Sequence, residues 1–144
     1  MTITKDSKHT VEISVSVERI ADLLSHALES GDVGYWLRLG KVLGYTKRNR
    51  ERAGYLAERH DPVIWLPLAG GSVEIIEHND SNDPKNWSRP VLLDLAAVKR
   101  GLALMADPKN EHAHHFGDWL KECDDMTTGD VFLQFCVLGE VKYG

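Results

Sequence analysis

The sequence predicts an α+β domain in which an antiparallel sheet of about four to five strands carries its helices mainly on one face. Two observations predict this class. Segments with a period of two, typical of strands, dominate the first two thirds of the chain, and segments with helical periodicity fill the last third. The 144 residues suffice for one hydrophobic core, so we expect residues 1–144 to form a single domain with a flexible N-terminus at 1–9.

The N-terminal elements are a strand, a helix and a second strand. Apolar and polar side chains alternate over residues 11–17, which predicts a half-buried strand. Ser16 then caps a helix whose apolar positions over 20–28 follow a period of 3.6, and Gly31 ends it. Alternation resumes over 35–43 and predicts the second strand.

The middle of the chain predicts a hairpin and a further strand. Residues 63–68 and 72–78 are joined across Gly70-Gly71, a pattern typical of hairpins. Residues 79–88 are rich in Asn, Asp, Ser and Pro, which predicts a loop. A short strand over 89–93 would complete the sheet.

Three helices are predicted in the last third. Asp94 caps the first, which Pro108 stops. The second runs over about 114–123. The third begins at the cap Thr128 and ends at Gly139.

Two unpaired edges suggest self-association. The tail at 140–143 is predicted to return as an edge strand, and the strand at 11–17 offers a second free edge. Symmetric dimers are the commonest way to cover such edges, so we expect a homo-oligomer.

Composition excludes several classes of protein. The apolar runs are too short and too interrupted by charge for a membrane span, and the polar N-terminus lacks the apolar core of a secretory signal, so we expect a cytoplasmic protein. The two cysteines, Cys123 and Cys136, fall at apolar helix positions and are predicted to be buried thiols. Neither a zinc motif nor a nucleotide-binding glycine motif is present, so no metal or cofactor is predicted.

Charge is strongly segregated along the chain. Residues 38–59 carry seven basic and two acidic side chains, a net charge of +5, whereas the whole chain has a net charge of −5. The remaining residues, ten basic and twenty acidic, therefore sum to −10. We interpret 46–60 as a basic surface segment, either a loop or a short helix, that faces one anionic partner. Duplex nucleic acid is disfavoured because the acidic remainder would repel a long polyanion.

The preferred ligand from sequence is an anionic small molecule of nucleotide type, held by the protein without catalysis. Guanidinium and ammonium groups would meet its phosphate, and an exposed aromatic ring would stack on its base. The alternative for the basic stretch is a solvated surface that balances the acidic body. The predicted ligand-binding residues are Tyr35, Trp36, Arg38, Lys47, Arg48 and Arg50.

Two rival functions remain open from sequence. An inhibitor that docks on a host protein predicts a contiguous exposed apolar or aromatic patch without a deep pocket. A small hydrolase predicts that His114, His115, Asp118 and Asp130 converge in one cleft as acid–base or metal residues. The alternative for this cluster is a polar helix start, with Asp130 near the beginning of the next helix.

Four segments carry a resemblance. They are the helix at 17–28 with Tyr35-Trp36 after it, the sequence GLALMA at 101–106, the sequence HFGDW at 115–119, and TTGDVFLQ at 127–134 followed by GEV and a final YG. With these segments the chain resembles a family of small uncharacterised proteins encoded by phages and prophages. The resemblance implies an accessory protein that acts by binding a host component, as an inhibitor or as a ligand-sequestering protein in counter-defence.

Overall fold

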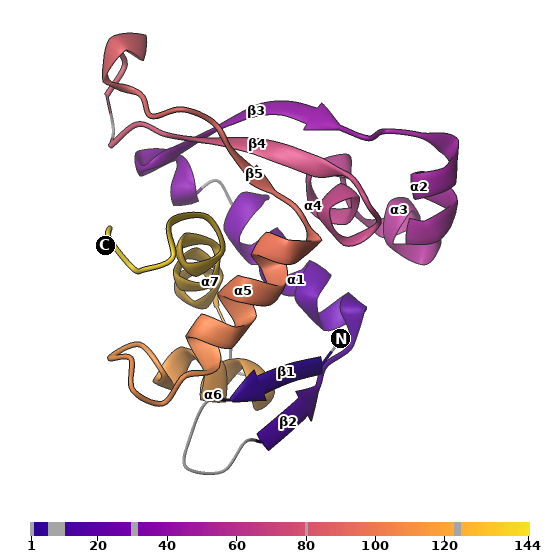
Figure 1. The fold of residues 1–144 in the computed structure, drawn as a ribbon, viewed down its shortest axis with the longest axis vertical. Helices are drawn as coiled ribbons and strands as arrows, with labels where there is room; N and C mark the ends of the chain where they lie inside the picture. The colour runs from indigo at the N-terminus through magenta and orange to yellow at the C-terminus, as the bar shows by residue number, and fades with distance from the viewer. Residues whose placement is uncertain (1, 6–10, 30–31, 80, 123–124) are drawn as a thin grey trace.

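The computed structural model describes residues 2–5, 11–29, 32–79, 81–122 and 125–144. Within these residues the fold is α+β, with seven α-helices and a three-stranded antiparallel sheet of order β3–β4–β5. Two further strands pair only with each other. Figure 1 shows the three-stranded sheet above a group of helices and the two-stranded pair at the opposite end. The α+β class is confirmed.

The single sheet of four to five strands is not confirmed. The described strands divide between two sheets, with β1 (Thr2–Lys5) on β2 (Val11–Ser14), and β4 (Ser72–Glu77) between β3 (Leu37–Leu43) and β5 (Val91–Leu93). Strand β1 lies where the sequence suggested only a flexible terminus. Residues 1 and 6–9 of that segment lie outside the described residues.

The predicted hairpin is wrong in its first half. Residues 63–68 form α4 (Pro62–Trp65) and the 3₁₀ turn Leu66–Leu68. Four consecutive side chains from Ile64 to Pro67 are buried, and a run that is apolar on every side does not distinguish a strand from a buried helix. Proline at the first helical position favours the helix, and Pro67 has no N–H for a sheet ladder. Strand β4 pairs with β3 instead.

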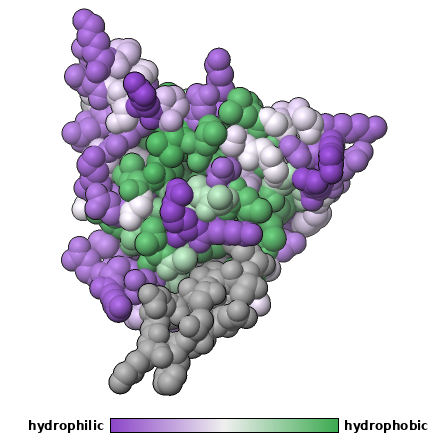
Figure 2. Space-filling model, viewed as in Figure 1, coloured by the Kyte–Doolittle hydropathy of each residue, from purple (hydrophilic) through white to green (hydrophobic). Residues whose placement is uncertain are grey.

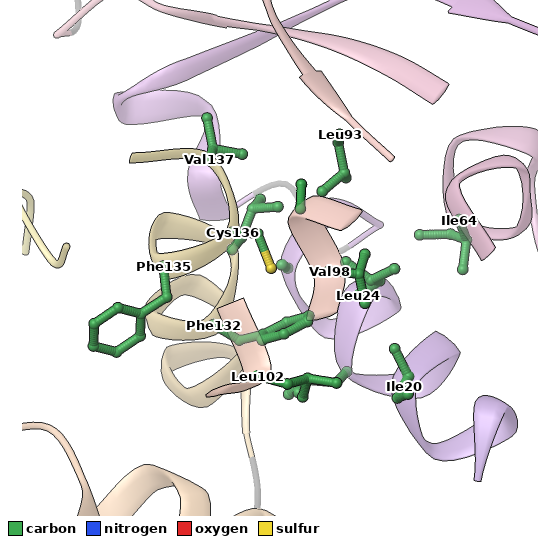
Figure 3. Close-up of a cluster of buried hydrophobic side chains, with 14 of the residues drawn as sticks. Ile20, Leu24, Ile64, Leu93, Val98, Leu102, Phe132, Phe135, Cys136 and Val137 are labelled. Carbon is green, nitrogen blue, oxygen red and sulfur yellow. The ribbon is translucent and has the colours of Figure 1, made fainter. Parts of the chain in front are cut away.

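Helix α7 (Met126–Leu138) is the centre of the core. It packs against α1 (Val17–Leu28) and α5 (Leu95–Ala106). Figure 3 shows Phe132 and Cys136 of α7 directed toward these two helices. Cys136 is a buried free thiol, as predicted, whereas Cys123 lies outside the described residues.

Local signals placed the long helices correctly. The Ser16 hydroxyl accepts from the Arg19 N–H at the start of α1, and the Asp94 carboxylate accepts from the Ala97 N–H at the start of α5. Gly139 ends α7 in the left-handed conformation. The predicted terminator of α1, Gly31, lies outside the described residues.

Two predictions at the C-terminal end are wrong. The cap of α7 is Asp125, whose carboxylate accepts from the backbone N–H of Thr128, so Thr128 lies inside the first turn. Residues 140–143 form no strand, because the side chain of Gln134 satisfies their backbone: its Oε1 accepts from the N–H groups of Lys142 and Tyr143 at 2.8 and 2.9 Å. Helix α6 (His114–Leu120) forms as expected. In the described part of the chain no helix is long and apolar enough to cross a membrane.

Candidate functional site

The basic segment is helical. It forms α2 (Lys47–Ala53) and α3 (Tyr55–Arg59), and on α2 the basic side chains Lys47, Arg48 and Arg50 are exposed while Ala53 is buried. Thr46 caps α2 by accepting from the Asn49 N–H at 3.1 Å. The Asn49 side-chain amide donates to the Gly44 carbonyl at 2.8 Å, which fixes α2 to the end of β3.

Arg38 lies at the other end of β3. Its Nη2 donates to Asn82 Oδ1 at 3.1 Å, and its guanidinium carbon lies 4.7 Å from the centre of the Trp87 ring. Arg38 and the end of β3 at Leu43 are five residues apart, roughly 16 Å along an extended strand. Arg38 and the α2 cations therefore cannot contact the same phosphate group.

The two candidate stacking residues have different environments. Trp36 is fully buried, stacks on Tyr143 with ring centres 5.8 Å apart, and donates from Nε1 to Asp130 Oδ1 at 2.8 Å. Tyr35 remains partly exposed, and its hydroxyl donates to Asp130 Oδ2 at 2.5 Å. Burial of the Tyr35 phenol, together with this hydrogen bond, raises the pKa of Tyr35 above its ordinary value. Trp36 is therefore a core residue and offers no face to a ligand.

Sequence reasoning missed the polar network around Asp130. The Asp130 carboxylate accepts from Tyr35, Trp36 and the Nε2 of Gln134, the last at 3.0 Å. The same Gln134 amide donates to the Tyr143 carbonyl at 3.1 Å. The network thus fastens the C-terminal residues and the entry to β3 onto α7. Its only local signal was the spacing of four between Asp130 and Gln134.

A second missed cluster forms at the end of β4. The Glu77 carboxylate accepts from Lys142 Nζ at 2.8 Å and from the hydroxyl of Tyr143. Burial alone would favour the protonated form, but these hydrogen bonds outweigh it and hold the pKa of Glu77 below its ordinary value of 4.5. A polar hollow of about 460 Å³ lies beside this cluster, with His78 and Ser88 also in its lining.

We expect Glu77→Gln to reduce the amount by which the free energy of unfolding falls when the pH is lowered. A carboxyl group whose pKa is lower in the folded state stabilises the fold above the unfolded-state value of 4.5, and this contribution is lost as the pH falls through the lower folded-state pKa. Free energies of unfolding from urea titrations at about pH 6 and about pH 3 should therefore differ less in this variant than in the wild type. Glu140→Gln, which removes an exposed carboxylate, is the control. Equal pH dependence of Glu77→Gln and the wild type would contradict the assignment.

The four proposed hydrolase residues do not form one group: Asp118 lies near His115 and interacts with it electrostatically, but Asp130 lies elsewhere. The rings of His114 and His115 have centres 4.1 Å apart, and His115 Nδ1 lies 3.2 Å from the hydroxyl of Thr128. Burial, followed by the neighbouring His114, lowers the pKa of His115. Asp130 follows Thr128 by two residues and so projects from the opposite side of α7, where Tyr35 and Trp36 bind it. Within the described residues, no group of three His, Cys, Asp or Glu side chains has an arrangement that could hold a metal ion.

Exposed apolar side chains accompany the cations of α2. Leu39, Val42 and Leu43 of β3 are about two-fifths exposed, and Tyr45 just beyond the strand is 53 % exposed. Figure 2 shows mainly hydrophilic side chains at the end of the molecule where α2 lies, whereas the apolar side chains across the middle of this face lie below β3. We define the β3–α2 surface as a set of exposed residues from β3, the residues after it and α2, namely Leu39, Lys41, Val42, Leu43, Tyr45, Lys47, Arg48 and Arg50. Arg38 of β3 and Glu51 and Arg52 of α2 are also exposed but are not part of this definition.

The comparisons with known proteins add no relative. No protein-family model, no curated protein and no solved structure matches the chain. The geometry of the described residues is therefore the basis for assigning a function.

Proposed function

We propose that this protein acts by binding another protein, and that the β3–α2 surface docks on an acidic region of that partner. The observation that carries the proposal is the juxtaposition of exposed apolar side chains with unpaired cations. In the part of the chain that the structure describes, no carboxylate lies within salt-bridge distance of Lys47, Arg48 or Arg50. Protein interfaces combine apolar contacts, which exclude water, with charges that steer and orient the partner.

The charge of the rest of the chain restricts where an acidic partner binds. Residues outside 38–59 sum to −10, so an acidic partner is repelled by most of the molecule and attracted by this one segment. Such segregation favours a single docking orientation. The resemblance to phage-encoded accessory proteins favours a host component as the partner, with inhibition or counter-defence as the outcome of binding.

This proposal uses the surface differently from the nucleotide-type ligand expected from sequence. Trp36 is buried, Tyr35 is engaged by Asp130, and roughly 16 Å of β3 separate Arg38 from Leu43, beyond which the cations of α2 lie. These residues therefore do not form one nucleotide site. A protein partner contacts a surface of this length readily, because interfaces commonly extend over some 800 Å² per partner.

A second candidate function, the binding of a small anion, rests on Arg38 and the hollow beside it. A mainly apolar hollow of about 520 Å³ lies beside Arg38 and Trp87, and Leu28, Val33 and Leu39 also line it. A guanidinium at the rim of an apolar hollow suits a small, partly apolar anion, which the protein would sequester without catalysis.

Reversing the charge of α2 should distinguish these functions. Lys47→Glu/Arg48→Glu/Arg50→Glu is expected to weaken binding of the host partner by about tenfold or more, because three attractive contacts become repulsive. The measurement is quantitative cross-linking mass spectrometry in host lysate, followed by titration with the purified partner. Lys85→Glu/Lys99→Glu/Lys109→Glu has the same net charge and alters exposed lysines elsewhere, so it should retain binding.

Two outcomes would contradict docking through α2. One is equal loss of the partner in both triple variants. The other is a small anion that co-purifies in native mass spectrometry, is retained by the α2 variant and is lost in Arg38→Ala, which would favour the sequestering function.

A further inference from the structure

We propose that the outer edge of β3 pairs with an extended acidic segment of the partner, which thereby adds a fourth strand to the β3–β4–β5 sheet. This inference rests on the proposed function and specifies how the partner binds. It predicts main-chain hydrogen bonds along β3 and charge contacts at α2.

The sheet leaves this edge open. Strand β3 has seven residues, the longest strand in the described part of the chain, and pairs with β4 on one side only. Figure 1 shows β3 on the outside of the sheet with no helix along it. A strand in this position presents alternate N–H and C=O groups that an added strand can bind.

The side chains of β3 provide the apolar contacts that an added strand requires. Leu39 and Val42 are 42 % and 40 % exposed although they pair with the buried Ile75 and Val73 of β4. Among the described residues no strand lies on the outer side of β3, which leaves these two side chains exposed. An added strand with apolar residues at alternate positions would cover them.

The charges on β3 disfavour a second copy of this chain as the occupant. Arg38 and Lys41 are its only charged residues, so pairing between two copies would bring like charges together. Lys41 lies on this edge, and an edge lysine disfavours pairing with an identical, equally positive edge. The same positive charges attract an acidic segment.

Helix α2 specifies where the acidic residues of the partner segment should lie. Three residues separate it from the end of β3, and Lys47, Arg48 and Arg50 are exposed there. An added strand that runs past Leu43 would bring its flanking residues close to these cations. The fitting segment therefore has alternating apolar residues with a cluster of Asp or Glu at the α2 end.

Single-stranded RNA fits the edge less well than a peptide. Non-specific binding of single strands uses a series of exposed aromatic rings on which bases stack. The exposed side chains of β3 include the aliphatic Leu39, Val42 and Leu43, and a peptide can also use the main-chain groups of the edge. RNA binding is therefore an outcome that the experiment must distinguish.

The test uses fluorescent twelve-residue peptides, each with four alternating valines and four acidic residues at one end; both end placements are made. Fluorescence anisotropy measures their affinity for the full chain. Two further sets of peptides are N-methylated, one at the odd positions and one at the even positions. Because alternate residues of a strand direct their N–H groups to opposite edges, each set lacks the donors of one edge. One set should weaken binding by about tenfold and the other should have little effect, because only one edge faces β3.

Hydrogen exchange provides the second measurement. Binding of the unmodified peptide should slow amide exchange within 37–43, because outward-facing N–H groups become hydrogen-bonded. Replacing the acidic residues of the peptide by Asn and Gln should weaken binding at low salt by about tenfold.

The outcomes separate the two proposals. Equal effects of both N-methylated sets, with binding still abolished by Lys47→Glu/Arg48→Glu/Arg50→Glu, would overturn strand addition and leave docking through α2 in place. Absence of binding of every peptide would overturn strand addition alone. Peptide binding that is unchanged in that variant would overturn the role of the α2 cations in both proposals. Tighter binding of an uridylate dodecamer than of any peptide would overturn a protein segment as the occupant of the edge.

Discussion

Gly101→Ala is expected to lower the free energy of unfolding by about 3 kcal/mol, at the upper end of the usual cost of overpacking a core. Gly101 lies in α5 where this helix crosses α7. A Cβ at this position would lie 2.2 Å from Cys136 Sγ, 2.8 Å from the Cys136 nitrogen and 2.9 Å from its Cα. Because two of these atoms are backbone, a side-chain rotation cannot relieve the clash, and the two helices must move apart.

The measurement is urea unfolding monitored by tryptophan fluorescence, which gives the midpoint and the slope of the transition. Gly117→Ala is the matched control, since it also lies within a helix but nothing lies within 4 Å of its added Cβ. There the substitution should stabilise the protein by about 0.5–1 kcal/mol through helix propensity. A loss below about 1 kcal/mol in Gly101→Ala would show that α5 and α7 do not approach as closely as described.

Asp130→Ala is expected to cost about 3 kcal/mol, because it removes the shared acceptor of three hydrogen bonds and leaves the Trp36 indole N–H buried without a partner. Tyr35→Phe, which removes only one of these bonds, should cost about 1 kcal/mol. Urea unfolding gives both values. Equal losses in the two variants would show that Asp130 contributes only through Tyr35.

The ionisation of Tyr35 gives an independent measurement of the same contact. Burial is the largest cause of the raised pKa of this phenol, and its hydrogen bond to Asp130 and the charge of Asp130 raise the pKa further. In Asp130→Ala the pKa of Tyr35 should fall toward its ordinary value of 10.0, because two of these causes are removed. Ultraviolet titration of tyrosinate, with Tyr35→Phe to assign the signal, measures the shift. An unchanged pKa would contradict the hydrogen bond.

The Asp130 network connects the C-terminal residues to the start of the proposed docking edge. Trp36 immediately precedes β3, and its ring lies against Tyr143. Loss of the network should therefore loosen the entry to β3 as well as the C-terminal residues. This places a stability determinant next to the β3–α2 surface without making it part of the contact with a partner.

Some of the candidate surface was predictable from sequence, and some was not. The excess of positive charge over 38–59 identified the segment, and the exposure of Lys47, Arg48 and Arg50 agrees with a basic surface. The sequence did not show that Arg38 lies apart from these cations, because this separation depends on the length of β3 between them. Alternation indicated that one of Tyr35 and Trp36 faces outward, but the network around Asp130 determines which.

The chain by itself determined the features that depend on near neighbours. The caps Ser16 and Asp94 bind N–H groups three residues away, and Gly139 ends α7 through its own backbone conformation, so short-range patterns sufficed for them.

Tertiary structure decided the features that depend on contacts between distant residues. Residues 64–67 are buried in a helix and a 3₁₀ turn, which the apolar run by itself could not distinguish from a strand. The tail forms no strand because Gln134 satisfies its backbone. Asp130 is an internal acceptor because Tyr35 and Trp36, more than ninety residues earlier, reach it. The same holds for the docking edge: the alternation of apolar residues predicted β3, but only the sheet order left its outer side without a partner.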